Sequence, residues 1–123
     1  MIVVWEKLCG MASAEVETVL NDLPESLREQ VRHMPITFEH KPNDALRADG
    51  IEEDTLGVFT GAEFANQGRA PMLPQIILYL ENIWEQAEGD GTAFREEIRT
   101  TFLHELGHFL GLDEDDLTER GLD

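Results

Sequence analysis

The first part of the chain carries apolar residues at steps of three and four. Residues with this spacing lie on one face of a helix, so the sequence predicts a helix from Val3 to Leu23. Glycine costs a helix about 1 kcal/mol, which leaves open a break between Gly10 and Ser13. Pro24 either stops this helix or begins a second one through Val31, for which Asp22 is a candidate cap. The apolar face comprises Trp5, Leu8, Cys9, Ala12, Val16, Val19, Leu20 and Leu23.

Three shorter segments are rich in β-branched and aromatic residues and predict strands. The first alternates apolar and polar residues over Met34–His40, as half-buried strands do, and the second covers Leu56–Thr60. Pro74–Leu80 gives the strongest pattern, with proline at its start, where the missing N–H disturbs a sheet least. The segments Asn43–Asp54 and Gly61–Met72 contain many polar residues together with glycine or proline, and they predict loops.

The helical pattern returns after the third strand. Glu81–Glu88 can form a short helix, which the glycines after it interrupt. Asp90 or Thr92 then caps a long helix that runs to Leu110, and a brief helix over Asp115–Arg120 follows. The buried face of the long helix is predicted to consist of Phe94, Ile98, Phe102, Leu106, Phe109 and Leu110.

This order of elements predicts an α+β fold, in which a small mixed sheet packs on the long helix and on the N-terminal helix. A length of 123 residues is typical of one domain, so we expect a single domain over residues 1–123. No apolar run approaches the roughly 18 residues that a membrane span needs. Cys9 is the only cysteine, which excludes an internal disulfide. Together with an opening too short for a signal-peptide core, this predicts a cytoplasmic protein.

The chain is strongly acidic, with a formal net charge of −17. Acidic residues gather at Glu52–Asp54 and at Asp113–Asp116. A surface of this charge repels phosphate backbones, so we expect no nucleic-acid partner. It attracts cationic peptides, although acidic surfaces more often serve solubility alone.

The stretch Thr101–Glu114 carries the most specific chemistry, because it contains the sequence His104-Glu105-x-x-His108. Residues four apart lie one helical turn apart on the same face, so both imidazoles can reach one ion. Catalytic zinc sites use three protein ligands and a water. Glu105 lies about 100° around the helix from His104, where its carboxylate can act on a metal-bound water as a general base.

A third ligand is expected shortly after the helix. Gly111 is the natural helix terminator, since glycine enters the left-handed conformation without penalty. Glu114, three residues further on, would then reach the metal, with Asp113 and Asp115 as alternatives. Two histidines and a carboxylate also match the facial triad of non-haem iron enzymes. We favour zinc because the glutamate between the histidines serves hydrolysis and is not required for oxygen chemistry.

The segment from His104 to Glu114 resembles the active-site motif of zincin metallopeptidases, and most closely that of a small bacterial family of zincin-like metallopeptidases. Leu23–Glu25, Leu56–Gly61 and Leu73–Tyr79 are also similar to recurring segments of that family. The chain departs from the family in carrying glutamate at position 114, where the family has aspartate, and from metzincins in lacking a methionine after the motif. The resemblance implies a minimal zincin-like fold and zinc peptidase activity.

Motif and resemblance together predict a zinc metalloendopeptidase, in which a metal-activated water hydrolyses the peptide bond and Glu105 is the general base. We expect a monomer that binds Zn²⁺ and acts on peptides or unfolded proteins at an open, shallow site. In zincins a strand at the cleft edge aligns the substrate, and the resemblance assigns this role to Leu73–Tyr79 or to the strand before it. The alternative is a non-catalytic, metal-containing module that binds peptides or regulates a partner.

Three side chains outside the motif have suitable chemistry for a site. Tyr79 could donate a hydrogen bond to an oxyanion, but an aromatic residue inside an apolar strand more often belongs to the core. His33 and His40 bracket the first predicted strand. A lone histidine at a strand edge is more often solvated or hydrogen-bonded than bound to a metal.

Overall fold

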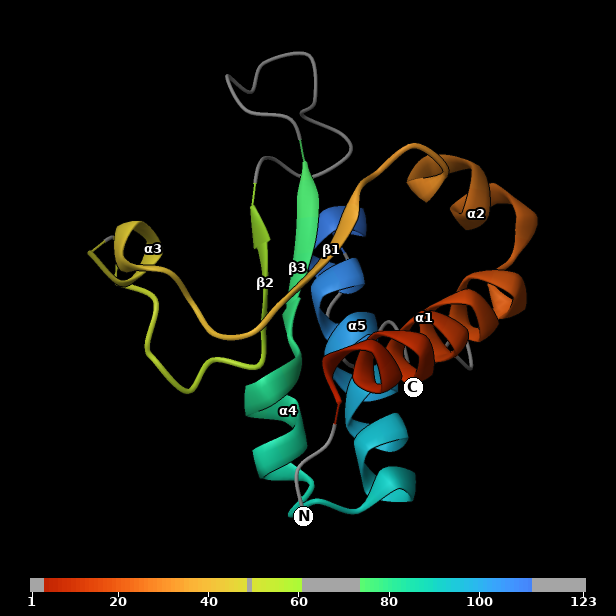
Figure 1. Ribbon diagram of the computed structural model, residues 1–123. Coiled ribbons are helices and arrows are strands. Elements are labelled where there is room, and N and C mark those ends of the chain that lie inside the picture. Colours follow the sequence, from red (N-terminus) through yellow and green to blue (C-terminus); the bar gives the residue numbers. More distant parts are fainter. Residues whose placement is uncertain (1–3, 49, 61–73, 112–123) are drawn as a thin grey trace.

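The sheet lies at the centre of the computed structural model, which describes residues 4–48, 50–60 and 74–111. Its strands are β1 (Ile36–Glu39), β2 (Gly57–Thr60) and β3 (Gln75–Tyr79). β3 lies in the middle, parallel to β1 and antiparallel to β2. The described sheet is therefore small and mixed, with β1 and β2 at its two edges (Figure 1).

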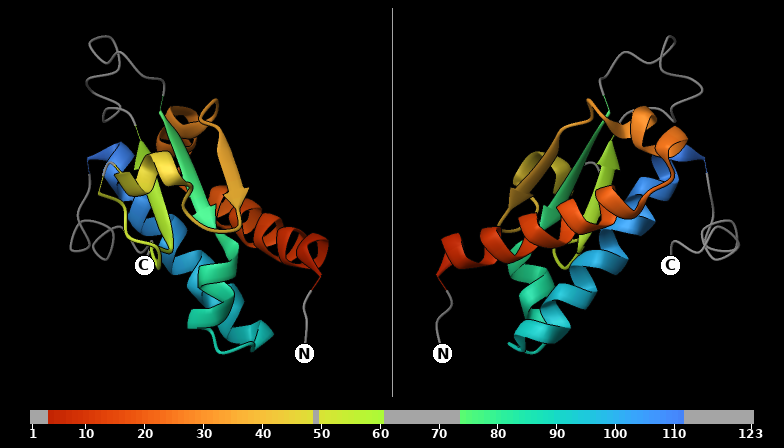
Figure 2. Two further views of the ribbon diagram at one scale, coloured as in Figure 1. Left: turned by 60° about the vertical axis from the view of Figure 1, so that its left-hand side comes forward. Right: turned by 90° about the vertical axis from the view of Figure 1, so that its right-hand side faces the viewer.

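Most of the helical packing lies on one face of this sheet. α1 (Trp5–Asp22) and α5 (Gly91–Leu110) pack against each other on one face, and the short α3 (Asp44–Ala48) lies on the side of the other face (Figure 2). α2 (Glu25–Val31) connects α1 to β1, and α4 (Leu80–Gln86) follows β3 directly. This arrangement confirms the predicted α+β fold: α5 packs directly on β2 and β3, and α1 shares one buried cluster with α5 and the sheet.

α5 has clear ends that the sequence encodes. The carboxylate of Asp90 accepts hydrogen bonds from the amides of Thr92 and Ala93, so Asp90 is the cap and Thr92 is not. At the other end Gly111 adopts the left-handed conformation, with φ 71°, as predicted for the helix terminator. The predicted apolar face is buried in one cluster with α1 and the sheet, and only Leu110 lies at its margin. The buried members from α5 are Phe94, Ile98, Phe102, Leu103, Leu106 and Phe109.

The structure decides three local details that the sequence left open or predicted otherwise. α1 continues without a break through Gly10, because this exposed glycine needs no special conformation and packing of the apolar face stabilises the whole helix. Pro24 occupies the N-cap position of α2 without a side-chain bond, so Asp22 is not the cap. α3 lies within the predicted loop Asn43–Asp54. Its sequence of alanine, leucine and arginine after an aspartate suits a single helical turn too short to show periodicity.

Alternate residues of β3 face opposite sides of the sheet. Ile76 and Leu78 belong to the cluster that includes α5, whereas Ile77 and Tyr79 lie outside that cluster. Tyr79 is nevertheless 0% exposed, and no group in the described residues bonds its hydroxyl. Burial, with a smaller contribution from Glu39, raises the pKa of Tyr79. Tyr79 is therefore a buried residue on the face of the sheet opposite α5.

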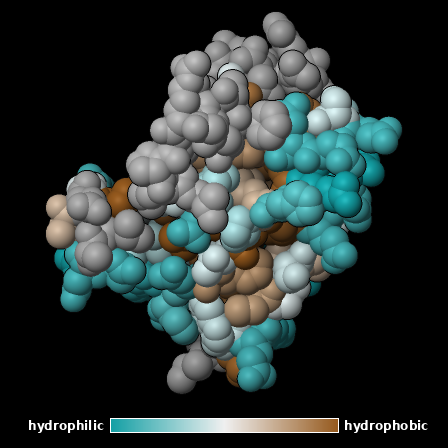
Figure 3. All heavy atoms as spheres, turned by 90° about the horizontal axis from the view of Figure 1, so that it is seen from above, coloured by the Kyte–Doolittle hydropathy of each residue, from teal (hydrophilic) through white to brown (hydrophobic). Residues whose placement is uncertain are grey.

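Seen from above, hydrophilic residues lie mainly toward the edges of the coloured surface, and hydrophobic residues are visible between them (Figure 3). Among the described residues, Val4 is the large apolar side chain that remains exposed. None of the described helices combines the length and apolar character that crossing a membrane requires.

Candidate metal centre

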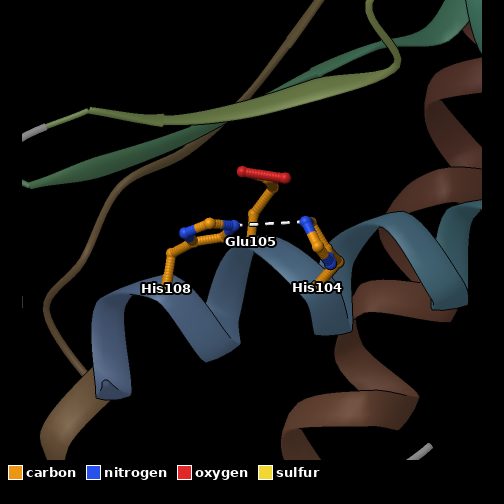
Figure 4. A group of neighbouring side chains, drawn as sticks. All are labelled: His104, Glu105 and His108. Carbon is orange, nitrogen blue, oxygen red and sulfur yellow. Dashed lines mark hydrogen bonds between the residues drawn. The ribbon is translucent and has the colours of Figure 1, made fainter. Parts of the chain in front are cut away.

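The last two turns of α5 bring three chemically active side chains together (Figure 4). His104 and His108 are exposed and point toward one another, while Glu105 turns toward the strands above the helix and is only 8% exposed. Ligand atoms of these three residues all lie within 4.8 Å of one another. Glu105 and Phe109 share the side of α5 that faces β2, where the rings of Phe109 and Phe59 lie 5.7 Å apart.

The two imidazoles have a spacing that suits a metal ion. The Nε2 atoms of His104 and His108 lie 3.1 Å apart, and the rings are inclined at 74°. Tetrahedral zinc at about 2.0–2.1 Å from two nitrogens would hold them roughly 3.3 Å apart. Only a small adjustment therefore separates this pair from a zinc-binding geometry. Imidazole nitrogen is also a ligand that zinc prefers, so the residues present fit the metal.

Glu105 is fixed by the sheet as well as by its own helix. Its Oε1 accepts a hydrogen bond of 3.1 Å from the backbone N–H of Phe59 in β2. Burial raises the pKa of Glu105, although His108, His104 and the Phe59 amide each act in the opposite direction. A buried carboxyl with a raised pKa is suited to exchanging a proton, which is the property required of a general base.

The raised pKa predicts a pH-dependent effect of Glu105→Gln on the metal-free protein. Glu105 binds its proton more tightly in the folded state, so the wild type loses stability as the pH rises from the unfolded pKa of about 4.3 through the folded pKa. The neutral amide does not titrate. We therefore expect Glu105→Gln to be more stable than the wild type at pH 8, by about 1.4 kcal/mol for each unit by which the pKa is raised.

Chemical denaturation at pH 4 and pH 8, in the presence of a chelator, measures this difference. The advantage of the variant should shrink toward pH 4, where both proteins carry a neutral side chain at position 105. An advantage that is equal at both pH values, or larger at pH 4, would contradict the raised pKa.

Of the other candidate ligands, the structure describes His33 and His40, and neither joins this cluster. Glu114 and its alternatives Asp113 and Asp115 lie outside the described part of the chain. His40 stacks on Trp5 at 3.8 Å between ring centroids, and its Nδ1 lies 3.1 Å from a carboxylate oxygen of Glu81. The structure thus gives His40 a role in joining α1, β1 and α4.

His33 is exposed in the turn between α2 and β1, and it is not part of the cluster formed by His104, Glu105 and His108. Tyr79, the candidate oxyanion donor, lies on the sheet face opposite α5, so its hydroxyl is directed away from the two histidines. Tyr79 therefore fits the structural interpretation of the sequence, as a buried residue of the sheet.

Two features of the site escape sequence reasoning. One is the amide of Phe59, because nearly every residue has a backbone N–H and the residue type does not show which one will bond Glu105. The other is the choice of edge strand. β3 is paired on both sides, so the assignment of Leu73–Tyr79 as the substrate-aligning strand is wrong. The strand before it, β2, is at an edge of the described sheet and lies over α5.

Comparison with known proteins agrees with this geometry. No curated protein matches the chain. The model of the zincin-like metallopeptidase family matches residues 31–122, about three quarters of the 123 residues, and this range includes the whole sheet and all of α5. The chain therefore belongs to the zincin-like metallopeptidase family.

Proposed function

We propose that this protein is a zinc-dependent endopeptidase that hydrolyses peptides or unfolded protein segments. One observation carries the proposal: two imidazole nitrogens lie 3.1 Å apart, with a buried carboxylate fixed beside them by a strand amide. His104 and His108 would hold the metal, and Glu114 is the proposed third ligand, with Asp113 or Asp115 in its place if the turn after Gly111 differs. Bound zinc supplies a Lewis acid that polarises a carbonyl and acidifies a water.

Glu105 would handle the proton. One of its oxygens is held by the Phe59 amide, so the other is left to accept a proton from the attacking water. As the carbon–nitrogen bond breaks, the same carboxyl would deliver that proton to the departing nitrogen, so that it leaves as a neutral amine. Burial supports this exchange, because it brings the pKa of Glu105 closer to neutral pH than that of a solvated glutamate.

The edge of β2 offers main-chain groups for an extended peptide. The Tyr79 amide donates to the Leu56 carbonyl, so Leu56 and Tyr79 form a hydrogen-bonded pair of the β2–β3 ladder. In an antiparallel ladder, hydrogen-bonded pairs alternate with pairs that exchange no backbone hydrogen bonds. Gly57 and Phe59 belong to the pairs that exchange none, so their N–H and C=O groups point away from β3. The Phe59 amide donates to Glu105, so among the described residues both backbone groups of Gly57 and the Phe59 carbonyl would be left for a substrate.

Recognition through main-chain groups favours a broad substrate range. Such hydrogen bonds require an extended segment and depend little on its side chains. Folded proteins rarely present a segment of this kind, which is why we propose peptides and unfolded segments as substrates. The formal charge of −17 would further favour cationic sequences.

A digest of a peptide library by zinc-loaded protein tests this function. We expect cleavage at internal peptide bonds, loss of cleavage with a chelator, and recovery when zinc is restored. The metal content of protein purified without chelator is measured on the same sample. Protein that takes up one zinc ion but cleaves no peptide would favour the non-catalytic binding module, and protein that takes up no zinc would refute the metal centre.

A further inference from the structure

We propose that Gly57 is a positioning residue of this site: because it has no side chain against Thr101, β2 comes close enough to α5 for the Phe59 amide to hold Glu105. The inference rests on the function proposed above, in which Glu105 acts as the base. It adds a residue that shapes the site although it neither binds the metal nor transfers a proton.

The space at Gly57 is smaller than a methyl group. A Cβ placed there would lie 2.8 Å from Cγ2 of Thr101, 3.1 Å from Cδ2 of Leu78 and 3.3 Å from the carbonyl oxygen of Ile77. The contact with Thr101 is too short to persist, so one element would have to move. Thr101 is buried, and its branched side chain has few rotamers, so its methyl group cannot easily swing aside.

Conformation does not require glycine at this position. The described glycines with positive φ are Gly50, Gly89 and Gly111, and Gly57 is not among them. An alanine could therefore adopt the same backbone dihedrals. What position 57 requires is the absence of a side chain, and glycine within a strand often marks such a close approach between elements.

The close contact and the hydrogen bond lie on the same pair of elements. Thr101 and Glu105 are four residues apart on one side of α5, and Gly57 and Phe59 are two residues apart on one side of β2. Thr101 thus opposes Gly57, and one turn later Glu105 meets the Phe59 amide at 3.1 Å. That distance is near the upper end of the usual 2.7–3.2 Å range. A strand displaced outward by a few tenths of an ångström would weaken the bond.

Amide hydrogen exchange in the metal-free protein tests the contact without reference to catalysis. Glu105→Ala removes the acceptor and gives the exchange rate of an unbonded Phe59 amide. We expect Gly57→Ala to bring the Phe59 rate close to that value, at least about tenfold above the wild-type rate. The double variant Gly57→Ala/Thr101→Ser lacks the obstructing methyl group of Thr101, so its Phe59 amide should exchange nearly as slowly as in the wild type.

Gly10→Ala is the matched control, because it also adds one methyl group to a glycine. No atom lies within 4 Å of a Cβ at Gly10, which is exposed on α1. Its Phe59 exchange and its kinetics should equal those of the wild type. Thermal unfolding of each variant shows whether a change is local or reflects loss of the fold.

Steady-state kinetics of the zinc-loaded variants gives the second readout. Misplacing the base should lower kcat of Gly57→Ala roughly 10- to 100-fold with a much smaller change in KM and in zinc affinity, and the double variant should recover most of kcat. If Gly57 served only to stabilise the fold, Gly57→Ala would lower the stability of the protein. It would then not lower kcat selectively relative to KM, and the double variant would not restore kcat.

Each outcome decides the inference. Wild-type exchange and kcat in Gly57→Ala would overturn it, and so would a double variant whose Phe59 amide still exchanges as fast as in Glu105→Ala. If Gly57→Ala does not fold, the double variant alone is compared with the wild type by the same criteria. If even the wild type cleaves no peptide, the proposed function fails, whereas the exchange rates still decide whether Gly57 sets the Phe59–Glu105 contact.

Discussion

Replacing His108 with alanine should weaken zinc binding by at least about 100-fold. The variant loses one of two imidazoles whose Nε2 atoms are spaced at 3.1 Å for a shared ion. Removing a group that only orients a ligand typically costs 10- to 100-fold in metal affinity, so losing the ligand itself should cost more. The measurement is a competition titration of metal-free protein against a chromophoric zinc chelator, and peptidase activity should be lost in parallel.

His33→Ala is the control for this variant. His33 is exposed and lies outside the cluster of His104, Glu105 and His108, so its loss should leave both zinc affinity and cleavage unchanged. Equal zinc affinity in His108→Ala and the wild type would exclude the proposed ligand pair. A drop in affinity with His33→Ala as large as with His108→Ala would place the ion elsewhere on the protein.

Exchanging Glu105 for glutamine should lower kcat by roughly 10²- to 10⁴-fold while zinc affinity stays near the wild-type value. An amide has nearly the same shape and can still accept the hydrogen bond from the Phe59 amide, but it cannot take up a proton at neutral pH. The variant would therefore lack the general base, while the arrangement of the other side chains of the site is kept. Stopped or continuous peptide cleavage with zinc-loaded protein gives kcat, and the competition titration gives the affinity.

A second glutamate of the same helix provides the comparison. Glu96 is exposed on α5, so Glu96→Gln makes the same chemical change at a site without catalytic neighbours, and kcat should not change. Undiminished cleavage by Glu105→Gln would remove Glu105 from the reaction. Peptide binding that persists in Glu105→Gln, measured with a labelled peptide, would separate recognition at the β2 edge from turnover.

The sequence was informative wherever the physics is local. The three- and four-residue spacing of apolar side chains located α1 and α5, and the cap at Asp90 and the terminator at Gly111 set the ends of α5. The spacing of His104 and His108 by one turn was enough to predict that their imidazoles meet. These features depend only on residues a few positions apart in the chain.

Contacts between distant segments could not be obtained in this way. The central place of β3 follows from how three strands pair, and strong β-propensity in its sequence says only that the strand is buried. The bond from the Phe59 amide to Glu105 joins residues 46 positions apart and uses a backbone group that every non-proline residue has. Gly57 was visible as a glycine in a strand, but what it makes room for is visible only beside Thr101.

α1 lies outside the range of the family match, which begins at residue 31. This helix ends at Asp22, yet its buried side chains belong to the same cluster as Ile98 and Phe102 of α5. The side of α5 that faces away from the imidazoles is thus sheltered by a segment that the shared family pattern does not include. A fragment that begins at residue 31 would therefore leave the apolar side of α5 that carries Ile98 and Phe102 without the cover that α1 gives it.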